Sequence, residues 1–455
     1  MRRRFLAGRG GRTIDPAYGT LRLSPPATLA LLFATCIAVG ALLLKMPFAA
    51  TGPISWLDAL FTATSAVTVT GLTVVDTGSG FTGFGQCVIL LLIQLGGLGI
   101  VTFAVLVFLL LGHRLGLRQQ VILYQDLGST SLGDVLRLVR VIALVMITAE
   151  GIGALVLAVH WIPLLGTAAG LWQAVFHAVS AFNNAGFSLW PDSLARWGGD
   201  PLVNAVIPAL FLLGGIGFGV LAEARQRRPW RRRPVHLRLM LAGTAVLIVF
   251  SVALTALLEW NNPGTLGGLD GWWPRLQAAW LQGVTTRTAG FSSVDIGRIE
   301  PDTALAYIVL MFIGGGSTST AGGIKVTTMI VLLAATWAFL RRRHQVVLLE
   351  RAIETADVLR SLALAFIGML LVTLGTFVLV LTQELPFLDL AFEAMSAFAT
   401  VGLSRGVTGA LDAVGQIVLV VLMFTGRIGP LALGFMLATP SRSRLRYPRG
   451  RVQLG

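Results

Sequence analysis

Four short segments of this 455-residue sequence place a glycine at the end of a polar or extended stretch. Backbone carbonyl oxygens arranged in a ring can replace the hydration shell of a cation, which is the chemistry such segments could perform. Glycine suits the turn because, without a Cβ, it readily adopts the positive φ that lets carbonyls point inward. The segments are Thr68-Val69-Thr70-Gly71, Asn183-Asn184-Ala185-Gly186, Arg287-Thr288-Ala289-Gly290 and Ala399-Thr400-Val401-Gly402.

The residues around the four glycines repeat at fixed offsets. Ten positions earlier there is an aromatic residue each time, and two positions later there is a hydroxylated residue: Phe61, Phe176, Trp280 and Phe392, then Thr73, Ser188, Ser292 and Ser404. Small residues often serve as close-packing contacts between membrane helices, which would account for any single glycine. Four glycines in register favour a repeated, inward-facing loop instead.

The composition predicts the kind of element that must position these loops. The chain is 55% hydrophobic and 12% charged, whereas soluble domains carry about 25% charged residues. Eight apolar runs approach or exceed the ~20 residues needed to cross a bilayer: 27–49, 86–111, 139–161, 202–222, 239–260, 305–339, 361–382 and 414–438. The sequence therefore predicts an all-α polytopic membrane protein with eight spans.

The segment before each glycine is too short and too polar to span a bilayer, which favours a re-entrant pore helix. Irregular backbone at membrane depth is tolerated only when protein shields it or water faces it. These segments are 56–68, 171–183, 275–287 and 387–399. We therefore expect four parallel helix–pore loop–helix repeats around a pseudo-fourfold pore axis. The predicted boundaries are 1–23 (basic tail), 24–113, 114–224, 225–343 and 344–440 (repeats one to four), and 441–455 (basic tail).

The charge pattern predicts the orientation. The net charge is +14, and the arginines cluster in five blocks that alternate with the spans and so fall on one side. By the positive-inside rule that side is the cytoplasm, with both termini inside. Such loops also suit anionic lipid headgroups. No soluble domain is left to bind nucleic acid, so a nucleic-acid partner is excluded.

Charged residues inside apolar runs are the other candidates. Arg427 would cost about 2.5 kcal/mol or more facing lipid, so we expect it to face the cavity or pair with a carboxylate; the alternative is snorkelling to the interface. Glu150 either hydrogen-bonds a pore loop or lines the pathway. Asp58, Asp389 and Glu393 lie on pore helices, where favourable interaction with the helix dipole explains them.

The filter segments, and Thr318-Ser319-Thr320-Ala321-Gly322-Gly323-Ile324-Lys325 after the third, resemble the Trk/Ktr/HKT superfamily of potassium transporters. The resemblance extends from about residue 24 to 440. It is strongest to the bacterial Ktr-type pore-forming membrane subunit, because no additional pair of spans precedes repeat one. The resemblance implies that potassium, with sodium as the alternative ion, binds at the filter: Thr68, Val69, Thr70, Gly71, Asn183, Asn184, Ala185, Gly186, Thr288, Ala289, Gly290, Thr400, Val401 and Gly402.

The resemblance also implies a gate. The stretch 314–325 interrupts the 305–339 run with poor helix formers, and in the family it is an intramembrane loop that obstructs the pore. The gate residues are then Gly315, Gly316, Ser317, Thr318, Ser319, Thr320, Ala321, Gly322, Gly323 and Lys325, with Arg427 limiting cation passage and contacting the loop.

The remaining implications concern partners and location. They are a separate cytosolic ring of Rossmann-type subunits that binds adenine nucleotide, a homodimer of the pore subunit, and the bacterial cytoplasmic membrane. No cofactor is expected in this chain. Two other functions would leave different features in the sequence. A secondary transporter would require inverted halves and a midplane site. An integral-membrane enzyme would require a cluster of catalytic groups within the membrane, and the sequence does not suggest one.

Overall fold

The computed structural model describes residues 25–98, 132–224, 229–317 and 319–429. Within them the fold is helical, apart from five short 3-10 turns and one hairpin, β1 (Val347–Leu348) and β2 (Arg351–Ala352). The predicted tails 1–23 and 441–455, and the boundary at 113/114, lie outside the described residues. So does Thr318 of the gate.

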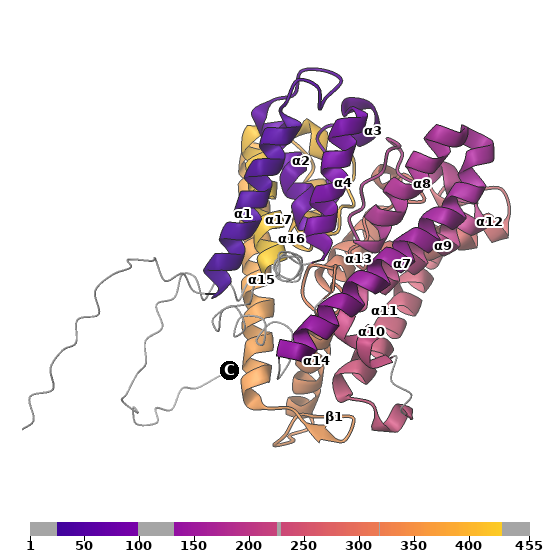
Figure 1. The fold of residues 1–455 in the computed structure, drawn as a ribbon. Helices are drawn as coiled ribbons and strands as arrows, with labels where there is room; N and C mark the ends of the chain where they lie inside the picture. Colours follow the sequence, from indigo (N-terminus) through magenta and orange to yellow (C-terminus); the bar gives the residue numbers. More distant parts are fainter. Residues whose placement is uncertain (1–24, 99–131, 225–228, 318, 430–455) are drawn as a thin grey trace, which may run out of the picture.

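The helices follow the expected order of a first outer helix, a pore helix and a second outer helix (Figure 1). The first helices are α1 (Pro25–Leu44), α7 (Leu132–Leu165), α11 (Val235–Glu259) and α15 (Thr355–Thr382). The pore helices are α2 (Trp56–Thr68), α8 (Thr167–Phe182), α12 (Trp272–Thr285) and α16 (Phe387–Phe398). The second helices are α4 (Gly83–Gly97), α9 (Pro201–Gly215) with α10 (Phe218–Ala224), α13 (Pro301–Phe312) with α14 (Val326–Leu340), and α17 (Ala413–Ile428).

The pore helices form the packed centre of each repeat. Three of the four aromatic residues found in register, Phe61, Phe176 and Phe392, are fully buried. The start of α2 is fixed by a capping box, in which Ser55 and Asp58 each accept the other's backbone N–H. Such a box satisfies two of the backbone donors left free at a helix start. Asp58 is thus explained by its position at the helix N-terminus.

Within the described residues the second helix is interrupted in repeat two as well as in repeat three. The break between α13 and α14 agrees with the predicted interruption at 314–325. The expectation that 202–222 forms one continuous helix was wrong, because α9 ends at Gly215 and α10 begins at Phe218. Between them Gly217 has φ +108°, and a Cβ there would lie 2.6 Å from the carbonyl oxygen of Ser317. The loop of repeat three therefore packs into the break of repeat two.

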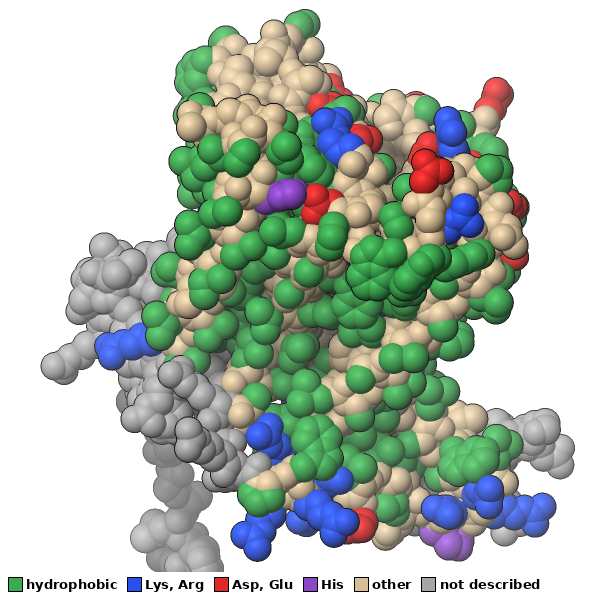
Figure 2. Space-filling model, turned by 90° about the vertical axis from the view of Figure 1, so that its right-hand side faces the viewer, with side chains coloured by type: hydrophobic (Ala, Val, Ile, Leu, Met, Phe, Trp, Pro, Cys, Tyr) green, Lys and Arg blue, Asp and Glu red, His purple; other side chains and the backbone are tan. Residues whose placement is uncertain are grey.

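The surface is that of a membrane protein. Three helices are long and apolar enough to span a bilayer by themselves: Val139–Leu165, Val235–Glu259 and Thr355–Thr382. The other outer helices are shorter apolar elements in the part of the chain that is described. Figure 2 shows a broad hydrophobic band above an end rich in arginine. Exposed arginines at that end include Arg231 and Arg232 before α11 and Arg341–Arg343 after α14.

Candidate functional site

The four glycines meet around one point, in the order of the chain. A Cβ added to Gly71 would clash with the Ala185 carbonyl of repeat two, and one added to Gly402 would clash with the Thr70 carbonyl of repeat one. Likewise, a Cβ at Gly186 would lie 2.8 Å from the Cα of Gly290, and one at Gly290 would lie 2.5 Å from the Val401 carbonyl oxygen. The four segments therefore close into a ring in which repeats two and four lie opposite each other.

The backbone of all four segments has the same unusual conformation. Each glycine has a positive φ, and so does the non-glycine residue two positions before it: Gly71, Gly186, Gly290 and Gly402 (96°, 68°, 78° and 90°), and Val69, Asn184, Thr288 and Thr400 (58°, 57°, 64° and 49°). A non-glycine residue in the left-handed region costs about 1–3 kcal/mol and persists only where its surroundings enforce it. Such strain clusters at functional sites, and here it recurs four times in register.

The ends of the pore helices impose this conformation. In repeats one, two and four, the residue directly before the glycine closes a Schellman-type bond to the helix end, for example Thr70 N–H to the Ser65 carbonyl at 2.8 Å. The serine six residues before the glycine adds a side-chain bond. Ser65 Oγ accepts from Gly71 N–H at 3.0 Å and Ser396 Oγ accepts from Gly402 N–H at 3.1 Å. Repeat three has Val284 at this position and lacks the anchor.

The outer side of the ring opens into a polar cavity of about 460 Å³ whose lining includes all four glycines. Three carboxylates also line it. Asp192 pairs with Arg196 at 2.6 Å, Asp295 pairs with Arg298 at 3.1 Å, and Asp76 caps the short helix α3 (Thr77–Gly80). Exposed ion pairs of this kind contribute little to stability. The cavity gives solvent a polar approach to the carbonyls.

The predicted gate loop lies against the inner side of the ring. It connects α13 to α14 and is held to the break in repeat two, where Gly316 N–H donates to the Gly215 carbonyl at 2.9 Å. Inside the loop, Lys325 Nζ donates to the Ala321 carbonyl at 2.8 Å. A Cβ at Gly322 would clash with the hydroxyl of Thr400, a filter residue. The structure therefore brings the predicted gate and the predicted filter into contact.

Arg427 contacts two backbone carbonyls. One guanidinium nitrogen donates to the Gly96 carbonyl near the end of α4 at 2.6 Å, and another donates to the Thr320 carbonyl in the gate loop. The contact with the loop agrees with the sequence analysis. Of the two environments expected for Arg427, the cavity or a carboxylate, the described residues provide no carboxylate partner, and backbone carbonyls at a helix end and in an irregular loop serve as acceptors instead.

Two further buried ionisable residues contact the predicted filter segments. Glu150 accepts hydrogen bonds from Gln94 at 3.0 Å and from Asn183 at 3.0 Å, which favours the structural of its two expected roles. Arg287 donates to the Leu310 carbonyl of α13 at 2.5 Å. It therefore ties the third filter segment to the helix that leads into the gate loop.

The dipole explanation for Glu393 was incomplete. Its carboxylate is fully buried and accepts hydrogen bonds from the hydroxyls of Ser404 and Thr408, beyond the filter glycine. Asp389 pairs with Arg405 at 2.5 Å on the same segment. The sequence contains a signal for this second role of Glu393. Glu393 is the seventh residue of α16, too far from the N-terminus for the dipole effect of the first turn.

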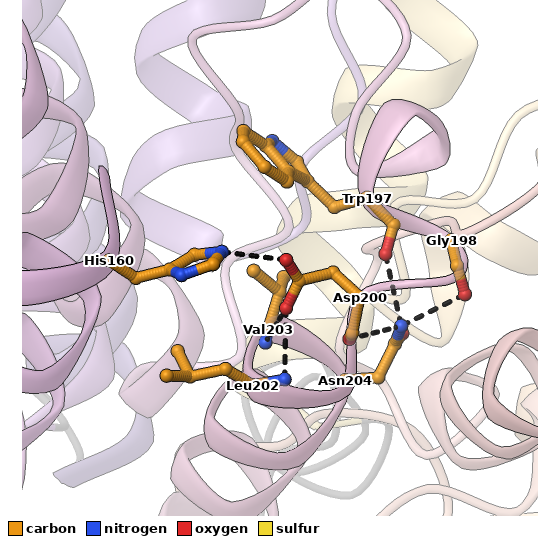
Figure 3. A network of polar contacts seen from close by, with 7 residues as sticks. All are labelled: His160, Trp197, Gly198, Asp200, Leu202, Val203 and Asn204. Atoms are coloured by element: carbon orange, nitrogen blue, oxygen red, sulfur yellow. Dashed lines mark hydrogen bonds and ion pairs between the residues drawn. The ribbon is translucent and has the colours of Figure 1, made fainter. Parts of the chain in front are cut away.

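One of the two histidines of repeat two, His160, has a structural role (Figure 3). His160 on α7 lies 2.6 Å from Asp200 Oδ2, and the other oxygen of Asp200 caps α9 through Leu202 and Val203 N–H. The Asn204 side chain donates to the carbonyls of the preceding turn. Across the described ranges no group of three His, Cys, Asp or Glu is placed to hold a metal ion. This network joins the outer ends of two helices.

Comparison with known proteins identifies the family of this chain. The cation transport protein family TrkH matches residues 35–447. The chain belongs to this family. Within the TrkH family, the chain is 47% identical over 441 residues to the Ktr system potassium uptake protein B of Bacillus subtilis (strain 168), which covers 97% of this chain and 99% of the relative. Membership in a transport family places it among transporters rather than enzymes.

Other relatives match this chain along most of their length. The chain is 42% identical to the Ktr system potassium uptake protein B of Vibrio alginolyticus, covering 94% of this chain and 95% of the relative. It is 35% identical to the potassium/sodium uptake protein NtpJ of Enterococcus hirae, covering 95% and 98%. The crystal structure of the potassium transporter TrkH from Vibrio parahaemolyticus has the same fold, with a TM-score of 0.72 at 18% identity over 93% of this chain and 87% of that one.

Proposed function

We propose that this chain is the pore-forming subunit of a bacterial potassium uptake system. The observation that carries the proposal is the closed ring of Gly71, Gly186, Gly290 and Gly402 beneath a polar outer cavity. Two relatives that match nearly the whole chain are named as potassium uptake proteins of a Ktr system, which supports potassium as the transported ion.

In this proposal the backbone carbonyls of the filter segments replace the water around a potassium ion. In each segment the glycine and the residue two positions before it have positive φ. This alternation turns successive carbonyl oxygens toward the pore axis and lets the backbone approach the axis closely. The carbonyl groups concerned belong to Thr68, Val69, Thr70, Gly71, Asn183, Asn184, Ala185, Gly186, Thr288, Ala289, Gly290, Thr400, Val401 and Gly402.

The gate is the loop 314–325 together with Arg427. The loop contacts the filter at Thr400 and accepts a hydrogen bond from the Arg427 guanidinium at the Thr320 carbonyl, which supports a closed position of the loop directly beneath the ion sites. A positive charge at Arg427 also opposes cation passage. Movement of the loop would open the path to the inner side.

The cytoplasmic side carries the regulatory contacts in this proposal. The exposed arginines before α11 and after α14 suit a cytosolic ring of Rossmann-type subunits that binds adenine nucleotide, and they suit anionic headgroups of the inner membrane. The word "system" in the relatives' names supports the existence of a further component. We further propose that both termini are cytoplasmic, by the positive-inside rule, and that the pore subunit is a homodimer.

Sodium is the second candidate ion. The specific observation is the potassium/sodium uptake protein of Enterococcus hirae, to which the chain is 35% identical. The third filter segment, which has Val284 in place of the anchoring serine, is the corner whose geometry is least constrained. We expect potassium to be preferred, with measurable sodium permeation.

The test is rescue of potassium-uptake-deficient bacteria on low-potassium medium, combined with rubidium flux. Growth and flux are expected when the chain is expressed with a regulatory subunit. Proteoliposomes in which the potassium and sodium gradients are varied independently then give the preference between the two ions. Absence of rescue and flux, with and without the partner, would overturn the proposal and favour transport of an organic solute.

A further inference from the structure

Thr320 lies where the gate loop meets the filter, and its three hydrogen-bonding groups contact three other segments. Its N–H donates to the Gly214 carbonyl of α9 at 3.3 Å, and its carbonyl accepts from Arg427 of α17. Its hydroxyl donates to Asn184 Oδ1 at 2.7 Å. Thr320 is fully buried, so water does not compete for these bonds.

The partner of the hydroxyl is a filter residue. Asn184 lies two positions before Gly186 in the strained left-handed conformation, with φ 57°. Its side-chain nitrogen donates to the Arg287 carbonyl of the third filter segment at 3.4 Å. Both ends of the Asn184 amide are therefore engaged, one with the gate loop and one with the neighbouring corner of the ring.

The contact on the opposite side of the ring is steric. Gly322 packs so closely on the Thr400 hydroxyl that a Cβ would clash with it. In the part of the chain that the structure describes, that hydroxyl has no hydrogen-bond partner. The loop is thus bonded to the filter of repeat two and only packed against the filter of repeat four. A displacement of the loop would change a hydrogen bond on one side and a van der Waals contact on the other.

We propose that the Thr320 hydroxyl couples the position of the gate to the selectivity of the filter. This inference rests on the proposed function. A strained backbone persists only while its surroundings enforce it, and the Thr320–Asn184 bond is one of those constraints. When the loop moves, Asn184 loses its donor, the second filter segment relaxes, and discrimination between potassium and sodium decreases. Thr320 is a positioning residue, since it acts on the ion through Asn184.

The test compares Thr320→Val with Thr320→Ser in proteoliposomes. Valine keeps the shape of threonine without the hydroxyl, and serine keeps the hydroxyl. Thr320→Val is expected to raise rubidium flux and to lower the rubidium-to-sodium ratio about threefold or more. Thr320→Ser is expected to retain the wild-type ratio. In the Asn184→Ala background, Thr320→Val should have no further effect on the ratio, because the bond is already absent.

The matched control is Thr255→Val. Thr255 is a buried threonine of α11 whose hydroxyl is 2.8 Å from the Tyr307 hydroxyl of α13, and neither residue belongs to the filter segments or the gate loop. The same chemical change there should lower the Tm and leave the ion ratio unchanged.

Other outcomes overturn the inference. If Thr320→Val raises flux at an unchanged ion ratio, the hydroxyl serves the gate alone; if flux and ratio both stay at the wild-type value, the bond has no role. Thr320→Ala adds no bulk and replaces Thr320→Val in the same measurements if the valine variant does not fold. A wild-type protein that passes neither ion would instead refute the proposed function, so the two failures are distinguishable.

Discussion

His177 and Glu393 occupy the same position in the pore helices of opposite repeats, nine residues before the filter glycine, and each bonds to the hydroxyl two residues after that glycine. His177 Nε2 lies 3.0 Å from Ser188 Oγ, and Glu393 accepts from Ser404 Oγ. Both side chains are fully buried. A polar side chain in the helix thus holds the outer end of the filter in repeats two and four.

Replacing Glu393 by leucine should lower both stability and selectivity. The hydroxyls of Ser404 and Thr408 would lose the carboxylate that accepts from both and would keep only their bond to each other at 2.8 Å. A buried polar group left without a partner costs about 1–3 kcal/mol. We expect a lower Tm in detergent and a smaller rubidium-to-sodium flux ratio.

A second buried glutamate provides the control. Glu259 on α11 accepts from Thr265 at 2.6 Å, outside the filter. Glu259→Leu should lower the Tm at an unchanged flux ratio. If Glu393→Leu behaves in the same way, its role is limited to folding.

Gly402→Ser should weaken potassium uptake. The serine would have to adopt φ near 90°, and its Cβ would clash with the Thr70 carbonyl of the neighbouring segment. Displacing one corner of the ring by a strain of about 1–2 kcal/mol corresponds to roughly a tenfold loss of apparent affinity. The measurement is concentration-dependent rubidium uptake by potassium-starved cells.

Gly166→Ser is the control that distinguishes the backbone strain of a positive φ from the steric clash of an added Cβ. Gly166 also has a positive φ of 87°, but a Cβ there would have nothing within 4 Å. This variant should lose some stability and keep its uptake affinity. Unchanged affinity and selectivity in Gly402→Ser would count against the filter assignment.

Deletion of residues 316–322 should raise ion flux and reduce its dependence on a regulatory subunit. These residues include Gly316, Thr320 and Gly322, which make the contacts between the loop, the break in repeat two and the filter. Flux would be measured in proteoliposomes with and without the partner. Equal flux in the full-length and shortened proteins would remove the gate from the proposal.

Variants of Arg427 should separate hydrogen bonding from charge. Glutamine removes the charge and the two-pronged contact with the Gly96 and Thr320 carbonyls, and we expect a several-fold rise in basal flux. Lysine keeps the charge but cannot reproduce the planar fork of arginine. An intermediate flux for Arg427→Lys would assign part of the effect to the hydrogen bonds, whereas wild-type flux would assign it to charge alone.

The sequence predicted the elements of this fold better than their contacts. Helix α2 has the predicted bounds, and α8 begins at Thr167 rather than 171, because Gly166 ends the preceding helix and starts the new one. Offsets around a repeated glycine are local and visible in one chain. This regularity made the four pore helices predictable.

Contacts between distant segments were beyond the reach of the sequence. The left-handed conformation of Val69 contradicts the preference of a β-branched residue and is enforced by the end of α2. The carbonyl partners of Arg427 lie 107 and 331 positions away in the chain. The break at Ile216–Gly217 resembled an ordinary packing motif because its cause, the loop of repeat three, belongs to another part of the sequence.

One polypeptide supplies all four filter segments. This affects how ion passage beneath the ring can be blocked. In a homotetramer, every subunit would carry an identical copy of a blocking segment, and four copies could not share the space on the axis. Here a single segment, supplied by repeat three, reaches Asn184 on one side and Thr400 on the opposite side. Covalent linkage lets the four repeats diverge, so repeat three can supply the proposed gate loop while the break in repeat two receives it.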